Sequence, residues 1–276
     1  MSVFWVILLL VVANAVTITA MLLVRRRAPE GSYFTDGDRA SGVFGVLAGG
    51  FAIFAGFIIL LAFTTYDQSR SGAEAEAISV VQQFESAVLF PPAVRHRLTG
   101  QLVCYARSVV HQEWPQMVAG KGRDTINPWG AALFQTLRVA DPRTAIEQTA
   151  YGKYLDQRAE RENGRNDRLH GAEGIIPTSI WLVLILIAGV VFGFMLFFAD
   201  SGEGVGAQAM LMGSAATVIV LTLAAINALD HPYRAGLGQI KPVAMQRSLR
   251  ILDAERAIVK DRAPVPCDAR GVQTSA

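Results

Sequence analysis

The chain has 276 residues, of which 52% are hydrophobic and only 17% are charged. Soluble domains usually carry about 25% charged residues, so this deficit excludes an ordinary water-soluble domain as a description of the whole chain. The net charge is +2 and no long basic run is present. Nucleic acid is therefore excluded as the main partner, because binding it requires many phosphate contacts.

Four apolar stretches without a charged residue lie at residues 2–24, 43–63, 180–199 and 207–229. About 20 apolar helical residues cross roughly 30 Å of hydrocarbon, so each stretch can span a bilayer. We predict an all-α integral membrane protein with four transmembrane helices in two hairpins. The stretch Ala13-Asn14-Ala15 looks like a signal-peptide cleavage site, but the basic residues follow the first apolar run instead of preceding it. An uncleaved anchor helix is therefore favoured.

The spans divide the chain into four predicted parts: a first hairpin (1–66), a helical extramembrane domain (67–176), a second hairpin (177–230) and a C-terminal tail (231–276). The end of the tail is rich in proline and small polar residues, so we expect it to be disordered.

Apolar residues three and four positions apart predict helices in the middle domain. One covers 73–88, and a second runs from Pro92 until Trp114-Pro115 stops it. A third follows Asp141-Pro142, where Asp141 can cap the helix and Pro142 can occupy its first position. Runs of alternating β-branched residues are absent, so few strands are expected.

Small residues recur in the spans at helical spacing. In lipid, close backbone approach has to drive helix association, and small side chains permit it. We predict helix packing at Gly45, Gly49, Gly56, Gly189, Gly193 and Gly213. Whether the packed partner is the same chain or a second copy is left open by the sequence. The strongly polar residues at depth, such as Asn14, Thr17 and Thr217, are interpreted as interhelical hydrogen-bonding groups.

The second span offers a candidate constriction at Phe51, Phe54, Phe57 and Ile58. An apolar ring in a pore can gate by dewetting, and Phe54 and Ile58 lie one helical turn apart. The alternative is ordinary packing or contact with lipid, and the residues alone favour that alternative.

The sequence offers no set of residues for catalysis, metal binding or cofactor binding. His111 and Glu113 are two positions apart and point in different directions on a helix. No nucleophile elbow or phosphate-binding glycine loop is present. An enzyme is therefore not expected, and neither is a metal or a cofactor. Cys104 and Cys267 could form one disulfide, but two free thiols are the favoured interpretation.

Charge alone does not decide which side of the membrane the middle domain occupies. Arg25, Arg26 and Arg27 favour one orientation, with the middle and the tail exported. The arginines between 158 and 168, together with the basic residues of the tail, favour the opposite one.

Three stretches resemble the bacterial bestrophin-like membrane proteins of the DUF4239 group. They are the end of the second span at 62–67, the segment 105–117, and the exit of the fourth span at 229–233. The resemblance covers about residues 40–250. Its motif residues are Glu113, Trp114, Pro115, Asp230, Pro232 and Tyr233.

A more distant likeness to true bestrophins rests on the two helical pairs and on Asp230-His231-Pro232-Tyr233, which is similar to their Asn-Pro-Phe. The resemblance implies cytoplasmic termini and a cytoplasmic middle domain, a homo-oligomer around a central axis, and anion permeation past aromatic rings on the second span. The acidic run that serves calcium sensing in bestrophins is absent at 234–241, so calcium gating is not implied.

The leading functional hypothesis is an oligomeric, passive anion channel in the inner membrane of a bacterium, with the second span lining the pore. The alternative is a non-conducting scaffold anchored in the membrane. In that case Trp114 and the loop 121–130 would dock a protein partner.

Overall fold

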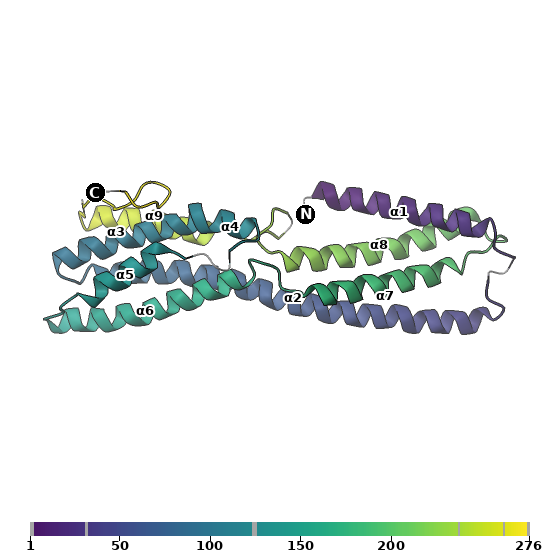
Figure 1. The fold of residues 1–276 in the computed structure, drawn as a ribbon, viewed down its shortest axis with the longest axis horizontal. Helices are drawn as coiled ribbons and strands as arrows, with labels where there is room; N and C mark the ends of the chain where they lie inside the picture. Colours follow the sequence, from purple (N-terminus) through teal and green to yellow (C-terminus); the bar gives the residue numbers. More distant parts are fainter. Residues whose placement is uncertain (1–2, 31–32, 123–125, 237, 262, 275–276) are drawn as a thin grey trace. The chain divides into compact units, whose positions relative to one another are not determined.

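A computed structural model describes residues 3–30, 33–122, 126–236, 238–261 and 263–274 (Figure 1). These residues form helices and no strand apart from one isolated bridge between Cys267 and Gln273. Four helices are long and apolar enough to cross a membrane: α1 (Val3–Arg25), α2 (Gly37–Ala87), α7 (Thr178–Leu196) and α8 (Val205–Asp230). The predicted all-α, four-span architecture is confirmed.

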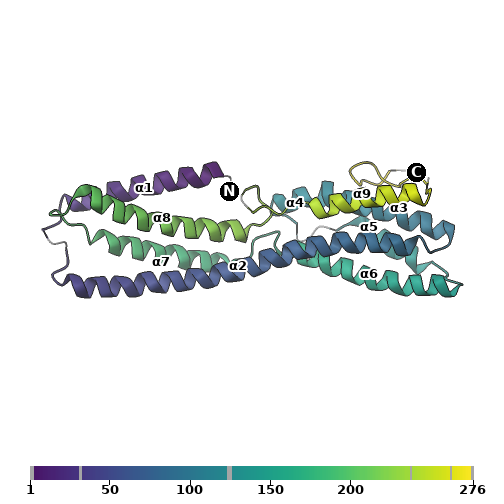
Figure 2. The same cartoon turned by 180° about the vertical axis from the view of Figure 1, so that it is seen from behind.

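The chain folds as two compact units. The membrane unit comprises Met1–Thr64, Ile175–Asp230 and Ala235–Gly238. The helical unit comprises Thr65–Gly174, His231–Arg234 and Gln239–Ala276. The predicted second span and the predicted helix 73–88 belong to one continuous helix, α2, which contributes to both units and is visible in both views (Figures 1 and 2).

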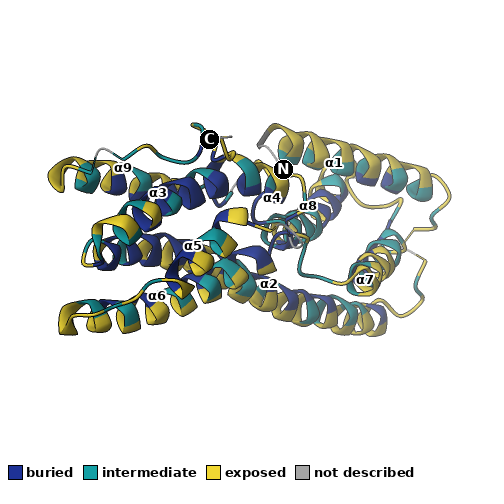
Figure 3. Ribbon diagram, turned by 60° about the vertical axis from the view of Figure 1, so that its left-hand side comes forward, coloured by how far each residue is buried: buried dark blue, intermediate teal, exposed yellow. Residues whose placement is uncertain are grey.

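In the membrane unit, α1 packs along α8 and is mostly exposed or half-buried elsewhere (Figure 3). Asn14 donates from Nδ2 to Thr217 Oγ1 at 2.9 Å, which confirms an interhelical hydrogen bond at this depth. Thr17 instead donates to the Ala13 carbonyl of its own helix. Interhelical bonding was therefore predicted correctly for Asn14, whereas Thr17 satisfies its hydroxyl locally.

Of the six glycines predicted to mediate packing, only Gly213 lies close to another helix of the same chain. A Cβ at Gly213 would lie 2.9 Å from Asn14 Oδ1. A Cβ at any of the other five would meet nothing within 4 Å; these are Gly45, Gly49, Gly56, Gly189 and Gly193. Their open faces are therefore left for lipid or for another copy of the chain.

The helical unit consists of the C-terminal part of α2 with α3 (Pro92–Ser108), η1 (Val109–Glu113), α4 (Trp114–Val118), α5 (Pro128–Arg138), α6 (Ala145–His170) and α9 (Val243–Ile258). Its apolar core joins side chains from all of the longer helices, including Phe84, Leu102, Tyr154 and Leu252. The second half of α3 is the most consistently buried helical segment (Figure 3).

Two predicted helix boundaries were wrong. The helix that begins at Pro92 does not end at Trp114-Pro115. It continues from α3 through the π-helical turn η1 into α4, which begins at Trp114. The helix after residue 141 begins at Ala145 and is capped by Thr144 instead of Asp141. Thr144 and Glu147 form a capping box, in which each side chain bonds the backbone N–H of the other. That pair satisfies two N–H groups, whereas Asp141 could satisfy only one.

A close helix crossing in the helical unit depends on two glycines. A Cβ at Gly164 of α6 would lie 2.6 Å from the Glu76 backbone nitrogen, and one at Gly72 of α2 would lie 2.8 Å from the Gly164 carbonyl oxygen. Real Cβ contacts are essentially never this short, so only glycine permits the two backbones to meet here. The crossing fixes the register between α2 and α6.

The end of the chain is attached to α3. Cys104 and Cys267 form a disulfide, so the interpretation as two free thiols was wrong. Gly271 adopts φ +79° and would clash with the Ser108 backbone if it carried a Cβ. Trp129 donates from Nε1 to the Gly271 carbonyl at 2.7 Å. The described residues 263–274 are therefore packed, in contrast to the expected disorder of this end; residues 262, 275 and 276 lie outside the described part.

We expect Gly164→Ala to destabilise the helical unit by about 1–3 kcal/mol, because the added methyl group forces two backbones apart. Gly152→Ala on the same helix is the matched control, since its Cβ would meet nothing within 4 Å. That control should stabilise the protein by about 0.5–1 kcal/mol through helix propensity. Equilibrium unfolding of the detergent-solubilised chain, followed by circular dichroism, measures both. Equal effects of the two substitutions would contradict the tight crossing.

Candidate functional site

A fully buried arginine, Arg168, is the centre of the polar core of the helical unit. Its guanidinium contacts two carboxylates from different elements. Glu76 of α2 accepts from Nη2 at 3.0 Å and from Nε at 2.5 Å, and Glu113 of η1 accepts from Nη2 at 2.7 Å. The three side chains are at most 1% exposed. We call this set, with the groups that bond it directly, the Arg168 cluster.

The local sequence explains how the carboxylates of Glu76 and Glu113 are positioned next to Arg168. The crossing at Gly72 and Gly164 brings α2 against α6, and Glu76 follows Gly72 by one helical turn. Glu113 ends the π turn, in which the N–H of Trp114 bonds the Val109 carbonyl.

The next residue, Pro115, explains this turn. Proline lacks an N–H and its ring clashes with the carbonyl four residues earlier in a regular helix. Widening the preceding turn relieves that clash, and π turns occur as such single turns inside α-helices.

Neutral side chains complete the cluster. Tyr105 donates its hydroxyl to Glu76 Oε1 at 2.6 Å, and Asn127 donates from Nδ2 to Glu113 Oε1 at 2.7 Å. Tyr233 donates its hydroxyl to the Arg168 carbonyl at 2.6 Å. The ring of Trp114 lies 5.5 Å from the Arg168 guanidinium and packs edge-on against Tyr233. Both carboxylate oxygens of Glu76 and both of Glu113 therefore accept hydrogen bonds from groups of the protein.

Burial and the neighbouring charges together decide the protonation of Tyr105 and Arg168. Burial raises the pKa of Tyr105 well above its ordinary value, and the negative charge of Glu76 adds to the effect, so this hydroxyl stays protonated and can donate. Burial lowers the pKa of Arg168, but the charges of Glu76 and Glu113 outweigh it and leave the pKa raised. Arg168 therefore remains a cation at any accessible pH.

A second polar layer lies beside the cluster. Arg161 is fully buried, donates to Gln83 Oε1 at 2.8 Å and stacks 4.6 Å from the Tyr105 ring centre. It also pairs with Glu162 at 2.7 Å. A cavity of about 430 Å³ opens next to this layer; its walls include Tyr105, Asn127, Phe134, Arg158, Glu162 and Arg165.

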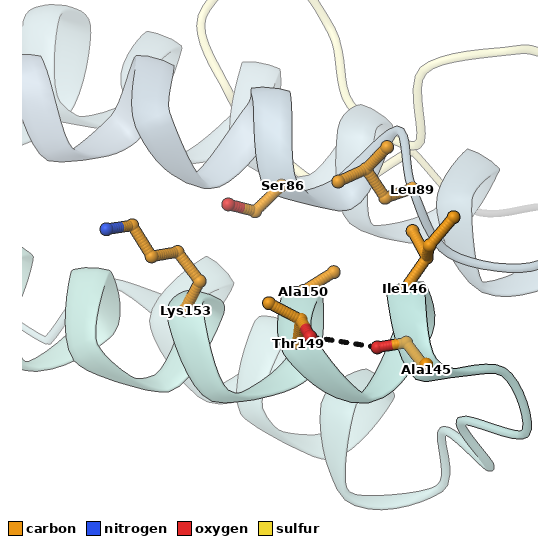
Figure 4. A pocket seen from close by; sticks show the side chains of 7 residues that line it. All are labelled: Ser86, Leu89, Ala145, Ile146, Thr149, Ala150 and Lys153. Atoms are coloured by element: carbon orange, nitrogen blue, oxygen red, sulfur yellow. Dashed lines mark hydrogen bonds between the residues drawn. The ribbon is translucent and has the colours of Figure 1, made fainter.

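An apolar groove of about 350 Å³ lies between the end of α2 and the start of α6, with Leu89 and Ile146 at one end and Lys153 at the other (Figure 4). The Thr149 hydroxyl bonds the Ala145 carbonyl of its own helix and is occupied (Figure 4). The groove therefore offers little polar chemistry.

The motif residues divide between the two units. Glu113, Trp114 and Tyr233 meet at the Arg168 cluster, and Pro232 is buried in the helical unit, whereas Pro115 is exposed. Asp230 belongs to the membrane unit. Its Oδ1 accepts the N–H groups of Ile175 and Ile176 at 2.7 Å each, and its Oδ2 accepts the Trp181 indole N–H at 3.0 Å. Asp230 thus ties the end of α8 to the approach to α7.

The structure does not bring the four predicted constriction residues onto one face. Phe51 and Ile58 are buried in the membrane unit with Leu184 and Ala188 of α7. Phe54 is half-buried beside them. Phe57 points away from this core and is 63% exposed. Within one chain, only Phe57 of the four remains fully available to a pore or to lipid.

A sequence model of the Bestrophin-like domain matches residues 3–245. The chain belongs to this family. No curated protein matches it. The resemblance to bestrophin-like proteins is therefore confirmed for this family, while the narrower group label stays a prediction.

Solved structures share the fold of this Bestrophin-like chain. A bacterial bestrophin homologue from Klebsiella pneumoniae with a tryptophan-to-alanine substitution has a TM-score of 0.67 at 14% identity, over 93% of this chain and 98% of that chain. Another variant, with a leucine-to-threonine substitution, has a TM-score of 0.65 at 14% identity, over 94% and 99%. A structure described as a membrane protein has a TM-score of 0.66 at 15% identity, over 91% and 98%. At these identities the likeness concerns the fold alone.

Sequence reasoning missed Glu76 and Arg168, the two residues on which the cluster depends. A signal was present for Glu76, which shares the apolar face of α2 with Ala73, Ala77 and Val80. Arg168 lay in a stretch with so many charges that no single one stood out. In the described residues, no group of histidine, cysteine, aspartate or glutamate is arranged to hold a metal ion.

We expect Arg168→Met to destabilise the helical unit by about 3–5 kcal/mol, because Glu76 would be buried without a cation and Glu113 would keep only Arg165, whose Nε lies 3.5 Å away. The triple substitution Arg168→Met, Glu76→Gln, Glu113→Gln should be more stable than Arg168→Met alone, since it removes both buried carboxylates together with the cation that balanced them. Arg70→Met is the control, because Arg70 pairs with Glu74 at the surface and should contribute less than about 1 kcal/mol. Chemical denaturation of the detergent-solubilised chains gives these values. A triple variant no better than the single one would contradict the ionic origin of the loss.

Proposed function

We propose that copies of this chain assemble around an axis in the inner membrane of a bacterium and form a passive anion channel lined by α2. Membership of the Bestrophin-like family supports the proposal, together with the distribution of side chains on α2. The spans contain no charged residue that could couple ion movement to protons or to another ion, so passive permeation is favoured over active transport.

Three stripes on α2 carry the argument. One stripe, with Phe51, Ile58 and Ala62, is buried within the chain. A second, formed by Gly45, Gly49 and Gly56, is open and small, and so permits close approach of a helix from another copy. The third, next to the second around the helix, carries large apolar side chains: Val46, Ile53, Phe57 and Leu60.

If neighbouring copies pack through the small stripe, the third stripe is the part of α2 nearest the axis. Ile53 and Phe57 lie one helical turn apart and are both more than 60% exposed. Rings of such side chains can form the narrow apolar part of a pore. The proposed constriction therefore moves from the four residues predicted by sequence to Phe57 and its neighbours Ile53 and Leu60.

The scaffold alternative receives less support. Its proposed docking residue, Trp114, is only 5% exposed and packs against Tyr233. A residue at that position stabilises the helical unit and is not available to a partner. Of its proposed docking loop, residues 123–125 lie outside the described residues.

Chloride flux into proteoliposomes containing the purified chain tests the channel proposal. We expect flux from the wild-type protein, and a rise of roughly two-fold or more for Phe57→Ala, because the narrowest ring becomes wider. Ile185→Ala on α7 is the matched control, since Ile185 is 57% exposed and lies outside α2. No flux from well-folded oligomers, or equal flux from the Phe57→Ala and Ile185→Ala proteins, would overturn the assignment of the pore.

A further inference from the structure

The two short connections of the membrane unit lie at one of its ends. Arg25, at the end of α1, donates from Nη2 to the Ser201 carbonyl and from Nη1 to Gln208 Oε1, each at 3.0 Å. It also donates to the Glu203 carbonyl. The connection between α1 and α2 and the connection between α7 and α8 must therefore face the same side of the membrane.

This end carries the basic residues that count most for orientation. Arg25, Arg26 and Arg27 follow the first span directly, and Arg39 lies in the first turn of α2. Basic residues in short loops face the cytoplasm, whereas long segments cross the membrane largely regardless of their charge. The residues between α2 and α7 number more than about 60, the loop length beyond which the rule loses force. The many arginines of the helical unit therefore weigh less than the cluster at 25–27.

A second, independent observation concerns the redox environment of the helical unit. Cys104 is fully buried and Cys267 is 6% exposed, and the two form a disulfide. They are the only cysteines of the chain. Cytosolic thiols are kept reduced by glutathione and thioredoxin, and structural disulfides belong to oxidising compartments such as the bacterial periplasm.

Hydrogen bonds to residues that follow Cys267 attach the last described segment of the chain to the rest of the helical unit. Arg107 donates to the Asp268 carbonyl at 3.3 Å, and Gln112 donates to the Arg270 carbonyl at 3.0 Å. On the same segment, the Gly271 carbonyl accepts the Trp129 indole N–H. We call residues 263–274 the C-terminal latch.

We propose that the helical unit lies on the extracytoplasmic side of the membrane, where oxidation of Cys104 and Cys267 locks the C-terminal latch onto α3. The two thiols lose two protons and two electrons by exchange with the disulfide of a periplasmic dithiol oxidase, which is released as a dithiol. This places the connections 25–37 and 196–205 in the cytoplasm. It reverses the orientation implied by the resemblance, and it does not depend on whether the protein conducts.

Fusions of the full chain to reporter proteins test the orientation directly. Alkaline phosphatase folds only after export, and green fluorescent protein exported through the general secretory pathway does not fluoresce. We expect the phosphatase fused after residue 276 to be active, with activity roughly ten-fold above that of the same reporter fused to a cytoplasmic protein. An inactive phosphatase fusion together with a fluorescent one overturns the proposal, and so does activity of both reporters.

Single-cysteine labelling in intact cells gives a second readout that needs no fusion. In a Cys104→Ser, Cys267→Ser background, Arg143→Cys should react with a membrane-impermeant maleimide, because the Arg143 side chain is 82% exposed in the helical unit. Ser201→Cys, in the connection between α7 and α8, is the matched control and should react only after permeabilisation. The reverse pattern overturns the orientation. If the background variant fails to fold, the reporter fusions, which keep both cysteines, decide the question alone.

The latch is tested on the unmodified chain. Cells are quenched in acid, and the denatured protein is treated with a polyethylene-glycol maleimide, which adds mass at each free thiol. We expect no mass increase without prior reduction and two additions after it. Two additions without reduction would show that the thiols are free in the cell, and would overturn the proposed lock.

Discussion

A buried guanidinium must meet compensating charge inside the protein, and the helical unit is arranged around that requirement. Moving an arginine out of water costs several kcal/mol unless carboxylates and hydrogen bonds replace its hydration. Arg168 obtains them from Glu76 and Glu113, which are 37 positions apart in the chain and belong to separate helices. The glycine crossing and the π turn are the two backbone features that deliver these carboxylates to one point.

Such a cluster does not add much net stability compared with a well-packed apolar core. Its effect is specificity: α2, η1 and α6 can associate in only one register without leaving a charge unpaired. Tyr233 extends this effect to the segment after the fourth span by bonding the Arg168 carbonyl. Tyr233 of the exit motif and Glu113 and Trp114 of the segment before Pro115 therefore belong to one arrangement in the helical unit.

The membrane architecture could be predicted because a run of about 20 apolar residues without charge rarely occurs outside a membrane span. The Arg168 cluster could not, since a charged helix normally has a solvated face and Arg168 looks like one more surface arginine. The sequence could not predict that Phe51 is buried and Phe57 exposed either. Lipid and the protein interior are both apolar, so hydropathy does not distinguish the buried stripe of α2 from its exposed one. Likewise, two cysteines 163 positions apart gave no spacing from which to infer a disulfide.

The latch and the Arg168 cluster are linked through two neighbouring residues. Asn127 bonds Glu113 with its amide nitrogen and caps α5 with its oxygen, which accepts the N–H of Trp129. The indole of Trp129 bonds Gly271 of the latch. A change in the latch can therefore reach a carboxylate of the cluster through Asn127 and Trp129, without rearrangement of the apolar core. Because Asn127 satisfies one oxygen of a buried carboxylate, losing its position would leave that oxygen without a hydrogen bond, so closure of the latch and complete hydrogen bonding of Glu113 favour each other.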